Sequence, residues 1–199
     1  MQTILVAKEW KHLYTIVNIN IQMEVIISTL KPFLEHPNRS FHIRELARIL
    51  NTNHMTVRKR LLQLVKEGYL ICTKSALTSN FQANISSKKY VNIRTYHHLE
   101  EIRKSNLIEH ISDEFEPLAI ILFGSYAKAT DDDKSDIDLF VLSVNKKELD
   151  LGTFEKKLGK KISLHIFTKG EWEKTKQKNP HLVNSICNGM TLAGFIEVV

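Results

Sequence analysis

The apolar positions in the first part of the chain recur at helical spacing, in short stretches that polar residues interrupt. Between residues 21 and 34, the apolar residues Val25, Ile26, Leu30 and Phe33 lie close to helical spacing, until His36-Pro37-Asn38 ends the pattern. A short strand is expected over residues 40–43 and a short helix over residues 44–50. This part of the chain is therefore predicted to be mainly helical.

A second short helix is expected directly afterwards. The polar turn Asn51-Thr52-Asn53 precedes a periodic segment from about Met55 to Lys66, and Gly68 follows as a typical residue just beyond a helix. Two short helices joined by such a turn form a helix-turn-helix.

This second helix separates its faces. Its apolar stripe consists of Val57, Leu61, Leu64 and Val65. Its polar side offers donors for base edges and cations for phosphates, as a helix in the major groove must. The candidate DNA-binding residues are Thr56, Arg58, Lys59, Arg60, Gln63 and Lys74.

A β-hairpin is expected after the helix. Residues 69–74 and 81–85 predict two strands, and the polar loop 75–80 between them would form a wing. Lysines near the hairpin would reach flanking phosphates: Lys74, Lys88 and Lys89.

The run "FHIRELARILNTNHMTVRKRLLQLVKEGYL" resembles the winged helix-turn-helix domains of bacterial and archaeal transcription regulators, over about residues 21–90. The resemblance implies double-stranded DNA as a partner. The alternative is that the same fold serves as a protein-interaction or dimerisation module. Residues 1–19 lie outside the resemblance and fit either an amphipathic helix or the arm of a homodimer.

The second half begins with an expected helix over residues 97–115, which Pro117 ends. The continuous apolar run 118–123 predicts a strand that is covered on both faces. It leads into Gly124-Ser125, where a residue without a Cβ and the start of a helix would suit a phosphate.

Two carboxylates open the next predicted strand, residues 136–142. Because side chains alternate along a strand, Asp136 and Asp138 share one face. Adjacent acids repel each other unless a cation lies between them, and oxygen ligands suit Mg²⁺.

The run "FGSYAKATDDDKSDIDLFVL" has ten residues between Ser125 and Asp136. It resembles the signature of the polymerase-β-like nucleotidyltransferases, in particular the minimal nucleotidyltransferases. The resemblance implies that Gly124 and Ser125 contact the phosphates of a nucleoside triphosphate. It also implies that Asp136 and Asp138 are catalytic and bind Mg²⁺ or Mn²⁺. The neighbouring Asp131, Asp132 and Asp133 are expected in a solvated loop.

The chain departs from the family pattern at two positions. Ala129 stands where the family usually has glycine, a small change at the end of a helix. Ser163 falls where active members have a third carboxylate. His165 lies on the same face of its strand and would serve as a base, although a half-buried structural histidine is the plainer interpretation. Glu171 or Glu173 would have to fold back to replace the acid.

Charge is distributed unevenly between the two halves. The formal net charge of +6 divides into +9 for residues 1–104 and −3 for residues 105–199. A basic first half attracts polyanions, which favours two modules with different partners. Cys72 and Cys187 have no metal-ligand spacing and are expected to be reduced core residues.

No apolar run approaches the roughly 20 residues of a membrane span, and the start of the chain lacks the features of a signal peptide. A cytoplasmic protein without a membrane segment is therefore expected. The expected fold is α+β. It comprises an N-terminal extension (1–19), a winged helix-turn-helix domain (20–95) and a small mixed α/β nucleotidyltransferase-like domain (96–199).

Three functions fit these features. The first is transfer of a nucleoside monophosphate to a protein or nucleic-acid acceptor, as in antitoxins of this family, with a HEPN-type toxin as the implied partner. The second is transcription regulation by a protein whose transferase domain has lost its chemistry and still senses a nucleotide, because Ser163 replaces the acid. The third is an interaction protein that uses neither site.

Overall fold

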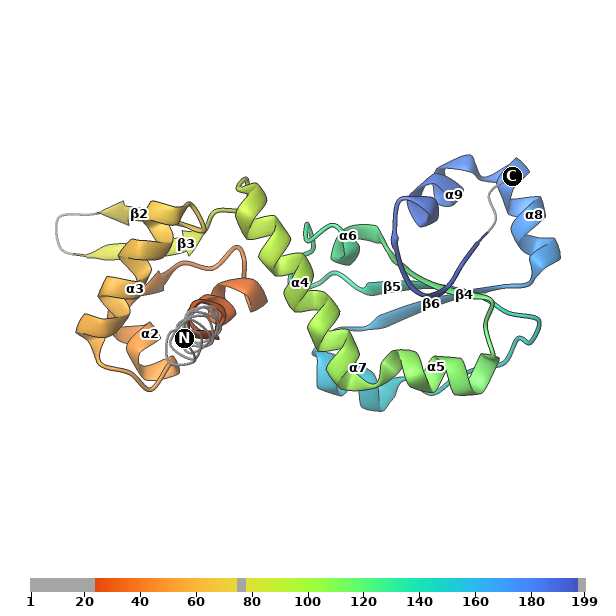
Figure 1. Cartoon of the computed structure of the whole chain (residues 1–199), viewed down its shortest axis with the longest axis horizontal. Helices are drawn as coiled ribbons and strands as arrows, with labels where there is room; N and C mark the ends of the chain where they lie inside the picture. The colour runs from red at the N-terminus through yellow and green to blue at the C-terminus, as the bar shows by residue number, and fades with distance from the viewer. Residues whose placement is uncertain (1–23, 75–77, 197–199) are drawn as a thin grey trace, which may run out of the picture. The chain divides into compact units, whose positions relative to one another are not determined.

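The computed structural model describes residues 24–74 and 78–196. The N-terminal extension 1–19 lies outside the described residues. The chain divides into two compact units, Met1–Ser87 and Lys88–Val199 (Figure 1).

In its described residues, 24–74 and 78–87, the first unit combines three helical segments with a small sheet. Residues 24–35 are helical. The elements that follow are β1 (Phe41–His42), α2 (Ile43–Ile49), α3 (His54–Glu67), β2 (Leu70–Lys74) and β3 (Ser79–Ala83). The strands pair antiparallel in the order β1-β3-β2. This is the topology of a winged helix-turn-helix, in which α2 and α3 form the helix-turn-helix and β2–β3 the wing hairpin.

Local signals in the sequence account for α3. The side chain of Asn53 accepts a hydrogen bond from the backbone N–H of Met55 and so caps the first turn, and Gly68 ends the helix in a left-handed conformation. The apolar stripe Val57, Leu61 and Leu64 is buried. Burial of this stripe turns the opposite, polar side of α3 toward solvent.

The second unit is a four-stranded sheet with helices on both faces (Figure 1). Its helices are α4 (Lys88–Ser105), α5 (Leu107–Phe115), α6 (Gly124–Ala127), α7 (Gly152–Leu158), α8 (Lys169–Lys178) and α9 (Pro180–Cys187). Its strands are β4 (Ala119–Phe123), β5 (Ile137–Leu142), β6 (Ile162–Phe167) and β7 (Met190–Gly194). The strand order is β6-β5-β4-β7, and β5–β6 is the parallel pair.

Alternate residues of β4 pack into two different cores. Ile120 and Leu122 lie with Ile111 and Phe115 of α5. Ala119, Ile121 and Phe123 lie with Trp172 of α8 and Ile186 of α9. Every residue of β4 is buried, so the strand is covered on both faces, as its continuous apolar run predicts.

Helix α4 runs without a break from Lys88 to Ser105, so the expected domain boundary at residues 95/96 falls inside it. The helix packs against α5, α6 and α7 and belongs to the second unit. Lys88 and Lys89 therefore begin this helix instead of extending the hairpin. The single helix expected over residues 97–115 is instead two helices, because Asn106 adopts a left-handed conformation with φ of 62°.

The prediction that both cysteines are core residues is wrong. Cys72 is half-buried on β2, and Cys187 is exposed in the last turn of α9. In both segments other apolar side chains fill the core, including Leu70 on β2 and Ile186 on α9.

Candidate functional site

The structure brings the Gly-Ser pair and the Asp-x-Asp pair together at one end of the antiparallel pair β4–β5. Phe123, the last residue of β4, pairs with Asp138 of β5. Gly124 follows with φ of 75°, and a Cβ added there would lie 2.2 Å from Oδ2 of Asp138. The carboxylate therefore lies directly against the glycine backbone, in space that any other residue would fill. The side chain of the adjacent Ser125 is partly exposed.

The two carboxylates interact with each other. Asp136 is exposed just before β5, while Asp138 on β5 is half-buried. Burial is the main cause that raises the pKa of Asp138 above its ordinary value; the nearby His165 opposes the rise and the charge of Asp136 adds to it. A cation placed between the two oxygens would relieve this repulsion.

Ser163 occupies the position next to Asp138 on the neighbouring strand. The parallel register pairs Asp138 with Ser163 and Phe140 with His165. A hydroxyl therefore stands where a carboxylate would complete a set of three. Across residues 24–74 and 78–196, no three His, Cys, Asp or Glu side chains form a group that could hold a metal ion.

His165 lies beside the carboxylate pair. Its Nε2 is 3.8 Å from Oδ1 of Asp138, and its side chain is 37% exposed. The imidazole and the ring of Phe123 meet in an edge-on arrangement, with 5.3 Å between ring centroids. The structure thus places the one strand histidine singled out from the sequence within reach of the candidate site.

The two glutamates considered as substitutes for the third acid are engaged in other contacts. Glu171 caps α8 by accepting hydrogen bonds from the backbone N–H and the hydroxyl of Thr168, and it pairs with Lys146 at 2.7 Å. These contacts, led by Lys146, lower its pKa to about 2. Glu173 pairs with Lys176 at 2.8 Å. Neither glutamate acts as the missing carboxylate in this arrangement.

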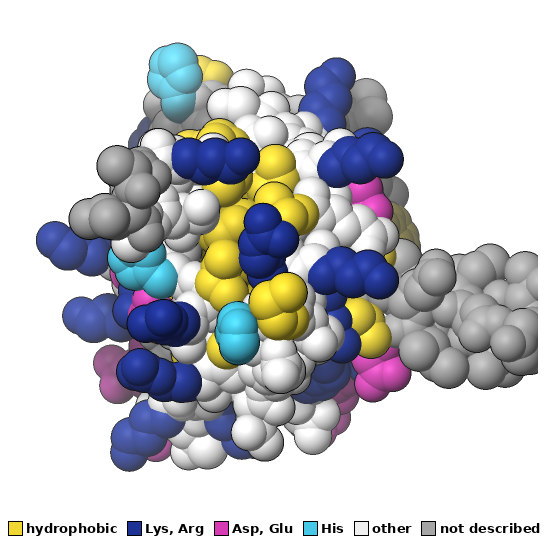
Figure 2. Space-filling model, turned by 90° about the vertical axis from the view of Figure 1, so that its left-hand side faces the viewer, with side chains coloured by type: hydrophobic (Ala, Val, Ile, Leu, Met, Phe, Trp, Pro, Cys, Tyr) yellow, Lys and Arg dark blue, Asp and Glu magenta, His cyan; other side chains and the backbone are white. Residues whose placement is uncertain are grey.

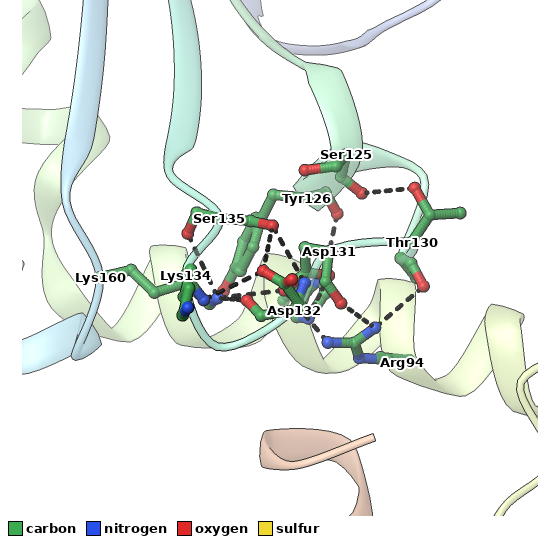
Figure 3. A network of polar contacts seen from close by, with 11 residues as sticks. Arg94, Ser125, Tyr126, Thr130, Asp131, Asp132, Lys134, Ser135 and Lys160 are labelled. Carbon is green, nitrogen blue, oxygen red and sulfur yellow. Dashed lines mark hydrogen bonds and ion pairs between the residues drawn. The ribbon is translucent and has the colours of Figure 1, made fainter. Parts of the chain in front are cut away.

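The expectation that Asp131 lies in a solvated loop is wrong. Its side chain is fully buried, with Oδ2 lying 3.1 Å from Nη2 of Arg94 and 3.3 Å from Nζ of Lys160 (Figure 3). His98 approaches the other oxygen, with 3.7 Å from Nε2 to Oδ1. Burial raises the pKa of Asp131, and the two cations oppose that rise. The neighbouring Asp132 and Asp133 are exposed, as expected.

Arg94 of α4 also holds the backbone of the loop between α6 and β5, and His98 of α4 holds the backbone of α6 itself. Arg94 Nη1 donates to the carbonyl oxygens of Ala129 and Asp131, at 3.0 Å in each case. His98 Nδ1 donates to the carbonyl of Tyr126 at 2.9 Å, and the two rings stack. The loop that joins Ser125 to Asp136 is thereby tied to one helix (Figure 3).

Sequence reasoning missed this anchor. Its signal was present, because Tyr90, Arg94 and His98 recur every four residues on the face of α4 that also buries Ile102. Polar residues on the buried stripe of a helix require buried partners.

Replacement of the usual glycine by Ala129 affects the backbone more than a small change at the end of a helix would, because Ala129 has a left-handed conformation. It lies beyond α6, is 6% exposed and has φ of 53°. This conformation is strained for any residue with a Cβ. A glycine at this position would relieve the strain.

The candidate DNA-binding residues fall on more than one side of α3. Thr56, Lys59 and Gln63 form one exposed stripe, with Gln63 donating to Glu67 at 2.9 Å. Arg58 is exposed on the opposite flank and Arg60 is half-buried, because it lies next to the buried stripe. Lys74 is exposed at the end of β2.

The exposed face of the first unit also carries apolar side chains. Met55 and Leu62 on α3 are 60% and 38% exposed, and Ile71 on β2 is 49% exposed. Figure 2 shows a band of hydrophobic side chains surrounded by Lys and Arg on the side that it views. Such a surface suits a protein partner as well as a polyanion.

Residues 105–189 match the sequence model of the family described as polymerase beta, nucleotidyltransferase. The second unit therefore carries a nucleotidyltransferase-family domain, and the whole chain has the expected α+β class. Among curated protein sequences, none matches this chain significantly. No helix within the described part of the chain is long and apolar enough to cross a membrane.

Two solved structures resemble part of the chain. The adhesin competence repressor AdcR from Streptococcus pyogenes is 21% identical, over 53% of this chain and 81% of that chain, with a TM-score of 0.33. ZitR from Lactococcus lactis is 16% identical, over 56% of this chain and 83% of that chain, with a TM-score of 0.34. Superpositions this loose do not define a common fold.

Proposed function

We propose that the protein binds a nucleoside triphosphate together with Mg²⁺ or Mn²⁺ through its second unit and DNA through its first. The observation that carries the nucleotide site is the close approach of Asp138 to the backbone of Gly124. It joins a backbone segment without a Cβ, where phosphates can approach, to a pair of carboxylates suited to a divalent cation.

The residues of the site have separate roles. Gly124 and Ser125 contact the nucleotide phosphates. Asp136 and Asp138 would hold the cation, which when bound would supply positive charge to polarise the α-phosphate for in-line nucleotidyl transfer. Most of this catalysis consists of positioning and charge neutralisation, which rigid anchoring of the loop by Arg94 supports.

Two residues near Asp138 favour different fates for the bound nucleotide. The position of His165, 3.8 Å from Asp138, favours transfer, with Nε2 accepting the proton of an attacking hydroxyl. The acceptor would then be a protein or nucleic acid, and an antitoxin-like role toward a HEPN-type toxin is one such case. Ser163 beside Asp138 favours the second candidate, a nucleotide-responsive regulator without turnover.

DNA binding by the first unit rests on its winged topology and on the exposed cations of α3 and β2. Electrostatic binding to DNA weakens steeply with salt. Binding that is no tighter at about 50 mM than at about 200 mM salt would instead favour a protein-contact role, for which Met55 and Leu62 are suited.

Calorimetry with ATP, GTP, CTP and UTP, with and without Mg²⁺, tests the nucleotide site. Wild type is expected to bind in a Mg²⁺-dependent manner, and the double variant Asp136→Asn, Asp138→Asn is expected to lose that dependence. Asp113→Asn, an exposed site on α5, is the control. Unchanged affinity in the double variant would refute the assignment.

Pyrophosphate release in the presence of candidate acceptors separates the two outcomes. If His165 is the base, His165→Ala should reduce release by about 100-fold or more while nucleotide affinity changes little. Mg²⁺-dependent binding without release by wild type, with every acceptor tested, would support the regulator.

A further inference from the structure

Two hollows on the surface of the first unit share a pair of arginines. They measure about 470 and about 500 Å³, and Arg44 and Arg48 of α2 line both. The first also contains Thr52 and His54, at the start of α3, and the second contains Thr78 and Ser79, at the start of β3. The arginines thus lie between the two elements that a winged helix presents to DNA.

Arg44 and Arg48 are spaced so that their side chains lie on the same face of α2. Four residues apart on a helix, their side chains emerge from one face. Both are exposed, and neither forms an ion pair with a residue in 24–74 or 78–196. Glu45, the carboxylate in the lining, is paired with Arg39. Among the residues that the structure describes, none neutralises the two positive charges in the hollows.

The chemistry of the lining selects a phosphate ligand. A guanidinium group binds phosphate oxygens with two parallel hydrogen bonds, and the hydroxyl group of Ser79 in the lining can add another donor. The hollows are open to solvent and carry two exposed cationic side chains, so they suit an extended charged backbone. Contacts of this type orient a protein on DNA without reading its sequence.

We propose that Arg44 and Arg48 bind phosphates of a DNA backbone strand that runs between α3 and the β2–β3 hairpin. The proposal rests on the proposed DNA binding by the first unit. It assigns strong phosphate contacts to α2, a helix for which the sequence analysis predicts no DNA contact. On α3, by comparison, Arg60 is half-buried and Gln63 is hydrogen-bonded to Glu67.

The test measures binding of the full chain to a labelled duplex of random sequence by fluorescence anisotropy, between about 50 and about 200 mM salt. The variant is Arg44→Ala, Arg48→Ala. The control is Lys104→Ala, Lys156→Ala, which removes the same charge from exposed positions of the second unit.

Each phosphate contact contributes about 0.9 to the slope of log K against log salt. The arginine variant should therefore lose about 2 from the magnitude of this slope, with at least about tenfold weaker binding at low salt. The lysine control should keep the wild-type slope. Arg44→Lys, Arg48→Lys retains the charge and should keep most of the slope while binding more weakly.

Two results would overturn the proposal, and they differ. If wild type binds DNA and the arginine variant keeps its slope, or if the lysine control loses as much, the hollows do not hold the backbone. If wild type itself does not bind DNA, the proposed DNA-binding function fails with it.

Discussion

Asp138 and Gly124 share one space: a Cβ on Gly124 would lie 2.2 Å from Oδ2 of Asp138. The two sequence motifs meet here, because one begins α6 directly after β4 and the other lies at the start of β5. The missing Cβ of Gly124 thus leaves room for the Asp138 carboxylate and would also let a phosphate approach the backbone.

Gly124→Ala is expected to displace the Asp138 carboxylate and abolish Mg²⁺-dependent nucleotide binding. Gly159→Ala is a matched control, because Gly159 has a similar φ of 66° and no atom near its missing Cβ. Both variants should lose about 1 kcal/mol of stability from backbone strain, measured by denaturant unfolding. Equal nucleotide affinity in the two variants would contradict a special role for Gly124.

Ser163→Asp should complete a set of three carboxylates. The residue already pairs with Asp138 across β5–β6, so no backbone change is needed. We expect about tenfold tighter Mg²⁺ binding, or about 1.4 kcal/mol, by calorimetry. Ser163→Asn, which adds similar volume without charge, should not tighten binding, and a similar gain in both variants would argue against a metal at this position.

Acid should destabilise the protein through His98. Burial, with contributions from Arg94, lowers its pKa to about 3 from 6.5, so the unfolded chain binds a proton that the folded chain excludes. Stability is therefore intact above pH 6.5 and is lost as the pH falls toward about 3, by up to about 1.4 kcal/mol per pH unit.

The variant His98→Asn isolates this effect, because its amide can still donate to the carbonyl of Tyr126. Between about pH 7 and about pH 5, wild type should lose about 2 kcal/mol more unfolding free energy than the variant. Urea unfolding at the two pH values measures the difference. Parallel losses would show that folding does not lower the pKa of His98.

Ala129→Gly should leave the protein as stable or raise its unfolding free energy by up to about 1 kcal/mol. Relief of the left-handed strain exceeds the loss of one buried methyl group. Ala127→Gly, which removes a buried methyl from α6, should instead lower stability by about 1 kcal/mol or more. Thermal unfolding of both variants provides the comparison, and a shift of the same sign in both would contradict the assigned strain.

The elements that the sequence predicts well have local signals. The apolar run of β4 and the polar turn and capping residue before α3 are contiguous in the chain. The break at Asn106 was missed, because asparagine adopts the left-handed conformation only in some contexts.

The candidate site was predicted only in part, because only some of its residues are close together in the chain. Gly124 and Asp138 belong to one short motif, whereas Asp131 is buried by Arg94 and Lys160, which lie far from it in the chain. Charge patterning places a run of three aspartates in solvent, and only the tertiary structure shows that the first of them turns inward. The arginine pair on α2 was missed as a site, because its meaning depends on hollows that folding creates.

The pairing of β4 has a consequence for synthesis of the protein. One neighbour of β4, strand β5, follows it closely, but the other is β7, where Ala119 pairs with Gly194. On a growing chain, one edge of β4 stays open until β7 leaves the ribosome. In the first unit, strand β3 pairs with β2, where Leu70 meets Ala83, and with the earlier β1, so both partners of β3 have already been synthesised when it emerges. Its wing should therefore fold while the second sheet is still incomplete and exposed to aggregation or chaperones.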